Sequence, residues 1–361
     1  MHLPTWDELL EEQKDVLGTP LNQSLFVVGP PGSGKTILAV ERARSSAEFE
    51  QRVVVVTYNR MLRRLVTLLD GPAADTMQVF VGRDYYRRTR SYPPTFVHDS
   101  YAYNWTEILE HLDCHENAEY TCDHLVIDEG QDLAPDFFRY AERHIAAVLT
   151  VFADDDQALG DRHTSVEEIL AATKLPDPII LSVNHRNRPE IAVVAEHFHA
   201  GRLPAAMVKR PSSGDRPRLI EGSSIKSTCD RIATWFQNRG GTIGVVVDRN
   251  ATASDVHKRL LTLLPSERVD LYTNKLRNED TIALLDPGIT VLNQESVKGQ
   301  EFDTLFLLEL ERFLPCTTAQ GKRVMYMLCA RARDYLFMIS GQPLSPAANA
   351  CLPPKEALER S

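Results

Sequence analysis

The sequence lacks any long hydrophobic run. Apolar segments such as Val53 to Val56 or Leu305 to Leu308 end after a few residues, whereas about 20 apolar residues are needed to cross a bilayer. The N-terminal stretch is rich in acids and has no basic segment followed by an apolar block, so it is not typical of a secretory signal. We therefore expect a cytoplasmic protein with no membrane partner.

Cysteine is scarce as well. Six cysteines in 361 residues, with no close CxxC pair, argue against a disulfide framework and against a zinc ribbon. We interpret them as reduced thiols. Histidine and cysteine do crowd one short region, but their spacing matches no common zinc-ligand pattern. We therefore assign no metal to His111, Cys114, His115, Cys122 and His124.

Positive charge is in short supply overall. The 40 Lys and Arg residues face 50 Asp and Glu residues, and the net charge of −10 would repel a polyanion if it were spread evenly. Residues 51–92, however, contain eight arginines and three aspartates, a net charge of +5 that leaves −15 on the rest of the chain. One face of the protein can therefore still attract phosphates.

Short β-branched runs separated by helix-length stretches predict parallel sheets covered by helices on both faces. The same alternation of short apolar runs and helix-length stretches begins again near residue 177, which indicates two α/β units over 1–176 and 177–340. Residues 341–361, rich in Pro and Ala, are expected to form a loosely held, flexible tail. The expected strands are Leu25–Val28, Val53–Thr57, Leu125–Ile127, Leu149–Phe152, Ile179–Val183, Ile243–Val247, Val269–Tyr272, Ile289–Leu292, Leu305–Leu308 and Tyr335–Ile339.

A phosphate-binding loop is predicted directly after the first apolar strand. The segment GPPGSGKT, residues 29–36, fits G-x-x-x-x-G-K-[ST] and precedes a helical stretch, as this motif requires. Its glycines allow the backbone to approach oxyanions, Lys35 reaches the β/γ-phosphates, and Thr36 offers a hydroxyl to Mg²⁺. The predicted nucleotide contacts are Gly29, Gly32, Ser33, Gly34, Lys35 and Thr36.

A carboxylate pair is predicted at the end of another strand. In the segment HLVIDE, residues 124–129, Asp128 would hold the metal and Glu129 would polarise the attacking water. Together with the phosphate loop, these residues predict a nucleotide hydrolase that uses Mg²⁺.

Further motifs lie before and after these two, and together they cover nearly the whole chain. The segment DEGQD (128–132) resembles the DExQD box of superfamily 1 helicases of the UvrD/Rep type, and further boxes follow in that family's order. The resemblance implies two tandem RecA-like P-loop NTPase domains with parallel sheets and an ATP cleft between them. The remaining segments are LEEQKDVL (10–17), VVVVTYNRMLRRLV (53–66), TVFADDDQAL (150–159), LSVNHRNRPEI (181–191), ITVLNQESVKGQEFDTLFL (289–307) and MYMLCARARDYLFMIS (325–340).

The resemblance also implies roles for single residues. Gln13 takes the position of a glutamine that lies against the adenine, and Gln157 lies next to the γ-phosphate. Arg186 and Arg331 take the positions of two phosphate-facing arginines, although either could instead pair with a surface acid. His185 replaces a tyrosine that stacks on the base, and the box SxKGxEFD supplies Lys298, Gly299 and Glu301.

A track for single-stranded nucleic acid is predicted in the arginine-rich region. Residues 83–92 interleave tyrosines with guanidinium groups, a composition suited to stacking bases while following a phosphate backbone. The alternative is a helix whose tyrosines face the core and whose arginines are solvated. The predicted contacts are Tyr58, Asn59, Arg60, Arg63, Arg83, Tyr85, Arg87 and Lys298.

The chain also departs from the family pattern. Ile37 follows the phosphate-loop threonine where many relatives carry arginine, and no aromatic residue follows Gln157. Only 32 residues separate Arg90 from Asp123, so the accessory insertions of larger relatives are absent. We therefore predict a minimal motor for single-stranded DNA or RNA, with DNA favoured. It would be a translocase or weak helicase that relies on a protein partner, in DNA repair or anti-phage defence. The alternative is a nucleotide-gated switch that recruits a partner protein without translocation.

Overall fold

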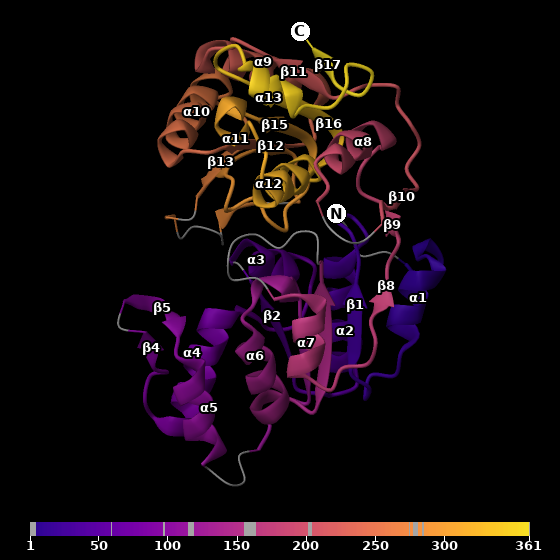
Figure 1. The fold of residues 1–361 in the computed structure, drawn as a ribbon, viewed down its shortest axis with the longest axis vertical. Coiled ribbons are helices and arrows are strands. Elements are labelled where there is room, and N and C mark those ends of the chain that lie inside the picture. Colours follow the sequence, from indigo (N-terminus) through magenta and orange to yellow (C-terminus); the bar gives the residue numbers. More distant parts are fainter. Residues whose placement is uncertain are drawn as a thin grey trace. The chain divides into compact units, whose positions relative to one another are not determined.

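The chain folds into two compact α/β units. The computed structural model describes residues 5–58, 60–96, 98–114, 119–154, 164–200, 204–273, 275–276, 281–283 and 285–360 (Figure 1). The first unit contains the chain up to Gly29 together with Gly34–Leu181, and the second contains Pro30–Ser33 and the chain from Ser182 onward. None of the helices in these described ranges is long and apolar enough to span a membrane.

The first unit is built on a six-stranded parallel sheet with the order β3-β2-β6-β7-β1-β8. Its central strands are short runs of Val, Leu, Ile and Phe, as expected for strands that are buried on both faces. The strands are β1 (Leu25–Val28), β2 (Val53–Thr57), β3 (Ala74–Thr76), β6 (His124–Ile127), β7 (Val148–Ala153) and β8 (Ile179–Ile180), and a separate antiparallel pair is formed by β4 (Thr95–Phe96) and β5 (Asp99–Tyr103).

Helices connect the strands of the first sheet, and α2 packs against β2, β6 and β7. The helices of this unit are α1 (Glu11–Gly18), α2 (Lys35–Glu48), α3 (Arg60–Leu68), α4 (Met77–Thr89), α5 (Trp105–Asp113), α6 (Pro135–Tyr140) and α7 (Val166–Ala172), with 3₁₀ turns at Trp6–Glu8 and Gly130–Asp132 and a π-helical turn at Ala141–Ile145.

The second unit is built on a seven-stranded parallel sheet with the order β13-β14-β12-β15-β16-β11-β17. A separate two-stranded parallel sheet pairs β9 with β10. The strands are β9 (Val183–Asn184), β10 (Met207–Val208), β11 (Arg218–Ile220), β12 (Thr242–Val247), β13 (Val269–Tyr272), β14 (Gly288–Asn293), β15 (Phe302–Leu307), β16 (Ala332–Ile339) and β17 (Glu359–Arg360).

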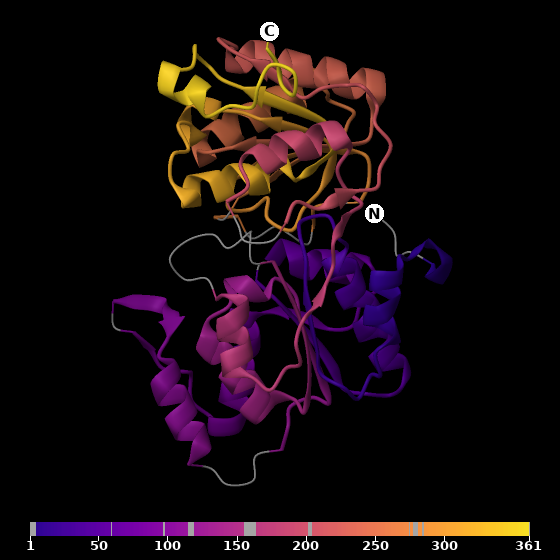
Figure 2. The ribbon, with the colours of Figure 1, turned by 45° about the vertical axis from the view of Figure 1, so that its right-hand side comes forward.

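Helices cover both faces of the second sheet, and successive side chains along a strand point to opposite layers. Val245 and Val247 of β12 join a core that α9 and α10 cover, while Val246 points to the opposite face. On that opposite face α8 packs against α12, and both contact β16 (Figure 2). The helices are α8 (Pro189–His197), α9 (Ile225–Arg239), α10 (Asn250–Leu263), α11 (Leu310–Phe313), α12 (Ala319–Cys329) and α13 (Pro346–Ala350).

Gly244 of β12 shows why a glycine interrupts an otherwise β-branched strand. A Cβ atom at this position would lie 2.4 Å from the ring of Phe302 in the neighbouring strand β15. Only glycine therefore allows this ring to pack over the centre of the sheet.

The predicted α/β class with parallel sheets is confirmed, and three strands have the expected bounds: β1, β2 and β13. Two details differ from the prediction. Ile179–Ile180 does not begin the second sheet, because it pairs with β1 as the edge strand of the first. Residues 341–360 are not a loose tail, because β17 pairs with β11 and Leu358 is fully buried.

Candidate nucleotide site

The phosphate loop leaves β1 at Val28 and enters α2 at Lys35. Gly32 and Gly34 have φ values of +79° and +90°, in the left-handed region that favours glycine. Gly34 caps α2, and the Oγ of Ser33 donates to the carbonyl of Pro30 at 2.9 Å. The first backbone N–H groups of α2 consequently form a site suited to an anion.

Lys35 lies across this loop. Its Nζ donates to the carbonyl oxygen of Gly29 at 2.6 Å and pairs with Asp154 Oδ2 at 3.2 Å. Asp154 follows β7 and is completely buried. The ammonium group is thus held beside the start of α2, where a bound phosphate would lie. Asp154 was not among the predicted site residues, although it belongs to the segment TVFADDDQAL.

Asp128 and Thr36 place two side-chain oxygen groups next to each other, where they could bind a metal ion. The Thr36 hydroxyl lies beside the Asp128 carboxylate, and Asp128 Oδ1 accepts the N–H of Glu129 at 3.0 Å. Asp128 Oδ2 is buried and accepts no hydrogen bond from any residue that the structure describes. Carboxylate and hydroxyl oxygens are the ligands that Mg²⁺ prefers, so these two residues fit the ion.

The charge state of Asp128 also fits a cation. Burial, followed by the neighbouring Glu129 carboxylate, raises the pKa of Asp128 to about 7, while Thr36 and Lys35 act in the opposite direction. Burial and the Glu129 charge thus both disfavour the ionised form of Asp128. A divalent cation at the unpaired Oδ2 would stabilise the charged form.

Glu129 has an unusual backbone conformation that is held by Gln131. Its φ is +56° and its ψ is +46°, a left-handed conformation that is strained for a residue other than glycine. Gln131 Nε2 donates to Glu129 Oε2 at 2.6 Å, and Gln131 Oε1 accepts the N–H of Asp154 at 2.9 Å. Gln131 therefore ties the ends of β6 and β7 together. The Gln of DEGQD was the signal for this role, but it was not among the predicted site residues.

Gln13 of α1 lies next to the phosphate loop. Its Oε1 accepts the N–H of Leu10 at 3.1 Å, and its Nε2 lies 3.0 Å from the point that a Cβ atom on Gly34 would occupy. The loop and α1 therefore pack closely. Gln157, the other glutamine predicted at this site, lies outside the described residues.

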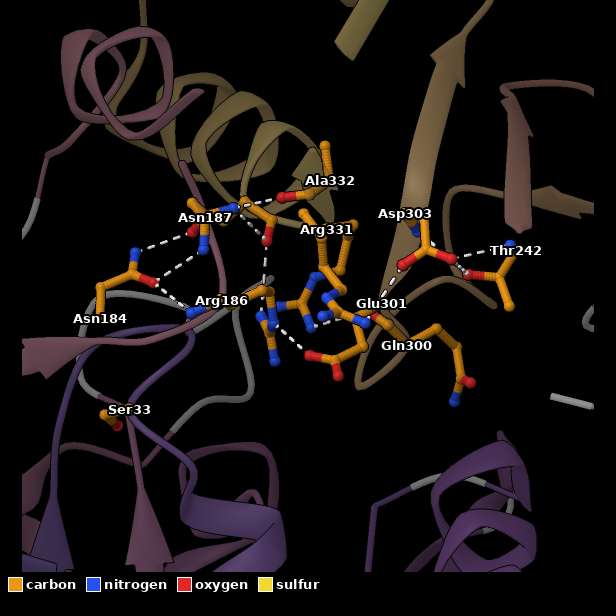
Figure 3. A network of polar contacts seen from close by, with 12 residues as sticks. Ser33, Asn184, Arg186, Asn187, Thr242, Gln300, Glu301, Asp303, Arg331 and Ala332 are labelled. Carbon is orange, nitrogen blue, oxygen red and sulfur yellow. Dashed lines mark hydrogen bonds and ion pairs between the residues drawn. The ribbon is translucent and has the colours of Figure 1, made fainter. Parts of the chain in front are cut away.

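The second unit brings its own predicted residues together (Figure 3). Arg186 Nε pairs with Glu301 Oε2 at 2.6 Å, and its Nη1 donates to the carbonyl of Ala330 at 3.4 Å. Arg331 Nε donates to the carbonyl of Met327 at 3.1 Å. His185 follows β9, and Lys298 and Gly299 (φ +78°) precede β15. Glu301, predicted as a nucleotide contact, is thus an ion-pair partner of a predicted phosphate-facing arginine.

The arginine-rich helix α4 differs from its predicted role. Tyr85 is buried, with its hydroxyl hydrogen-bonded to His111, so it cannot stack on a base. Arg87 donates to the buried Asp84 at 3.0 Å, and Arg83 pairs with Asp75 at 2.9 Å. For Tyr85 the expectation of a nucleic-acid contact is therefore wrong, because the helix turns this face towards the core.

The other predicted nucleic-acid contacts of the first unit lie around α3. Tyr58 is exposed, and Arg60 and Arg63 are partly exposed on the first turns of this helix. Asn59 lies outside the described residues.

Comparison with known proteins supports a nucleotide-binding domain in the first unit. A family model described as an AAA domain matches residues 13–160, which include the phosphate loop and DEGQD. No curated protein matches the chain. Among solved structures, the C-terminal domain of a possible DNA helicase from Lactobacillus plantarum WCFS1 is similar, with a TM-score of 0.35 and 18% identity, over 49% of this chain and 99% of that one.

Proposed function

We propose that this protein is an ATP-hydrolysing motor of the superfamily 1 helicase type that acts on single-stranded nucleic acid, DNA more than RNA. One observation carries the proposal: Lys35, Thr36 and Asp128, whose Oδ2 has no hydrogen-bond partner among the described residues, lie together at the start of α2. This arrangement supplies a cation, a metal site and a helix N-terminus for a triphosphate.

Phosphoryl transfer depends mainly on positioning and on charge neutralisation, and each proposed role meets one of these needs. Lys35 contacts the β/γ-phosphates, and Mg²⁺ held by Thr36 and Asp128 neutralises charge on them when bound. Glu129, held by Gln131, orients the attacking water. Gln13 and His185 contact the base. Arg186, Arg331 and Gln157 act at the γ-phosphate.

For the nucleic acid we propose the outer face of α4. Val79, Arg83 and Tyr86 are exposed at helical spacings, and Arg90 continues this face at the end of the helix. The rings of Tyr86 and Tyr92 lie 5.5 Å apart and are 44% and 83% exposed. Stacking on Tyr86 thus replaces the predicted role of Tyr85. The exposed Arg83–Asp75 pair is weak enough for Arg83 to exchange its partner for a phosphate.

The test is ATP turnover with and without single-stranded DNA and RNA oligonucleotides. We expect stimulation by single strands, and Tyr86→Ala should weaken oligonucleotide binding by about tenfold because one stacking platform is lost. Phe49→Ala is the control, since Phe49 is an exposed aromatic residue at the end of α2. If no oligonucleotide changes ATP turnover but a protein partner does, the motor hypothesis would be wrong. The result would instead support the nucleotide-gated switch.

A further inference from the structure

The turn that follows β9 is closed by two asparagines. Asn184 Oδ1 accepts the N–H groups of Arg186 at 2.9 Å and Asn187 at 3.1 Å. Asn184 Nδ2 donates to Asn187 Oδ1 at 2.7 Å. Both asparagines are buried. These bonds fix the backbone from which the Arg186 side chain extends (Figure 3).

Asn187 also fastens this turn to the segment that carries Arg331. Its Nδ2 donates to the carbonyl of Ala330 at 3.1 Å and to the carbonyl of Ala332. These two carbonyls flank Arg331 in the sequence, about 140 residues away along the chain. The N–H of Arg188 donates to the carbonyl of Arg333 at 3.0 Å and extends the same connection. Hydrogen bonds therefore join the peptides around both arginines directly.

The identity of residue 187 decides whether this connection can form. Serine is the small hydrogen-bonding side chain against which this can be judged. A serine hydroxyl has one proton to donate, whereas an asparagine amide donates two and its oxygen accepts. Only the amide can donate to both carbonyls while accepting from Asn184.

We propose that Asn187 is a positioning residue that holds Arg186 and Arg331 in a fixed mutual arrangement, so that both act on the same γ-phosphate. This inference rests on the proposed function. Asn187 itself touches no reacting group in this proposal. It acts because a misplaced arginine stabilises the transition state poorly, whereas nucleotide binding depends mainly on the phosphate loop.

The experiment compares Asn187→Ser and Asn187→Ala with wild type in steady-state ATP hydrolysis. We expect kcat to fall about tenfold or more while KM for ATP changes by less than about threefold. Serine is the milder change, because its hydroxyl can still donate to one of the two carbonyls. Asn349→Ser is the matched control: its Nδ2 donates to the carbonyls of Leu344 and Ser345 in the same unit, away from the arginines. It should leave kcat unchanged.

A double-mutant cycle separates positioning from general destabilisation. In an Arg186→Ala background, Asn187→Ser should reduce kcat by much less than it does in wild type, because one of the two arginines it positions is already gone. Equal effects in both backgrounds would contradict the inference. A wild-type kcat in Asn187→Ser would also overturn it while leaving the motor intact. Absence of any Lys35-dependent hydrolysis in wild type would instead overturn the proposed function.

Discussion

The two units use the same strand–turn–helix element in opposite ways. Between β1 and α2 of the first unit, six residues (29–34) form a loop whose glycines Gly32 and Gly34 have left-handed backbone conformations suited to wrapping an anion. In the second, only residues 248–249 separate β12 from α10, and the carboxylate of Glu309 binds this turn. Glu309 accepts the N–H groups of Asp248 at 3.0 Å and Arg249 at 3.1 Å, and the Thr252 hydroxyl at 2.8 Å.

A shared backbone feature makes the contrast sharper. Glu309 has a φ of +56°, as Glu129 does, and both residues follow shortly after a central strand. In the first unit the glutamate side chain is held by Gln131 beside the candidate site, whereas in the second it accepts the backbone N–H groups of the turn that precedes α10. In the second unit the backbone N–H groups of this turn thus bond to a carboxylate of the protein, whereas in the first the loop is proposed to bind a phosphate.

The largest effect is expected from Lys35→Ala. This change removes the cation at the open helix start, and we expect kcat for ATP hydrolysis to fall by at least about a thousandfold. The measurement is phosphate release at saturating ATP, with thermal unfolding to show that the variant is folded. Undiminished turnover would mean that the first unit is not the nucleotide-binding one.

The next largest effect is expected from Arg42→Met in the first unit. The guanidinium of Arg42 is buried and donates to the carbonyls of Thr19 and Pro20 and to the Thr150 hydroxyl. Burial lowers the pKa of Arg42 to about 10, so it stays charged at neutral pH. Removing the guanidinium leaves these acceptors without a hydrogen-bond donor, and the free energy of unfolding should fall by about 3 kcal/mol.

Denaturant titration followed by fluorescence measures this loss. The control is Arg44→Met, because Arg44 makes only a part-exposed pair with Glu41 and should change stability by less than about 0.5 kcal/mol. Because Arg42 anchors the segment after α1, KM for ATP should also rise in Arg42→Met. Equal stability of the two variants would contradict this anchoring role.

A smaller effect is expected from Glu309→Ala in the second unit. The change leaves the N–H groups of Asp248 and Arg249 and the Thr252 hydroxyl without their acceptor, and it should lower the free energy of unfolding by about 2 kcal/mol. Glu267→Ala, at an exposed position, is the control. The number of nucleotides bound per chain, measured by calorimetry, should stay at one, because the turn of residues 248–249 has no glycine to wrap a phosphate. A second bound nucleotide would show that Glu309 alone keeps it out.

The sequence predicted best what depends on continuous local patterns. β1 and β2 are short β-branched runs, and both were located to the residue. The phosphate loop and the Asp128–Glu129 pair could be recognised because their chemistry requires fixed residue types at fixed spacing. The two- and three-residue strands β17 and β11 carry no such pattern, and their pairing depends on distant partners.

The missed details depend on side-chain direction and on long-range contacts. Composition could not show that Tyr85 faces the core and Tyr86 the solvent, because a one-residue step on a helix turns a side chain by about 100°. Nor could it show that Asp84 would hold Arg87. The connection made by Asn187 joins residues far apart in the sequence and becomes visible only in the folded unit.

Among the described residues, the second sheet ends on β17, which is only two residues long. Its Glu359 and Arg360 pair with Arg218 and Leu219 of the longer strand β11. Short edge strands offer few backbone groups to strands from other molecules. Deletion of Glu359 and Arg360 would make β11 the edge and would therefore favour self-association.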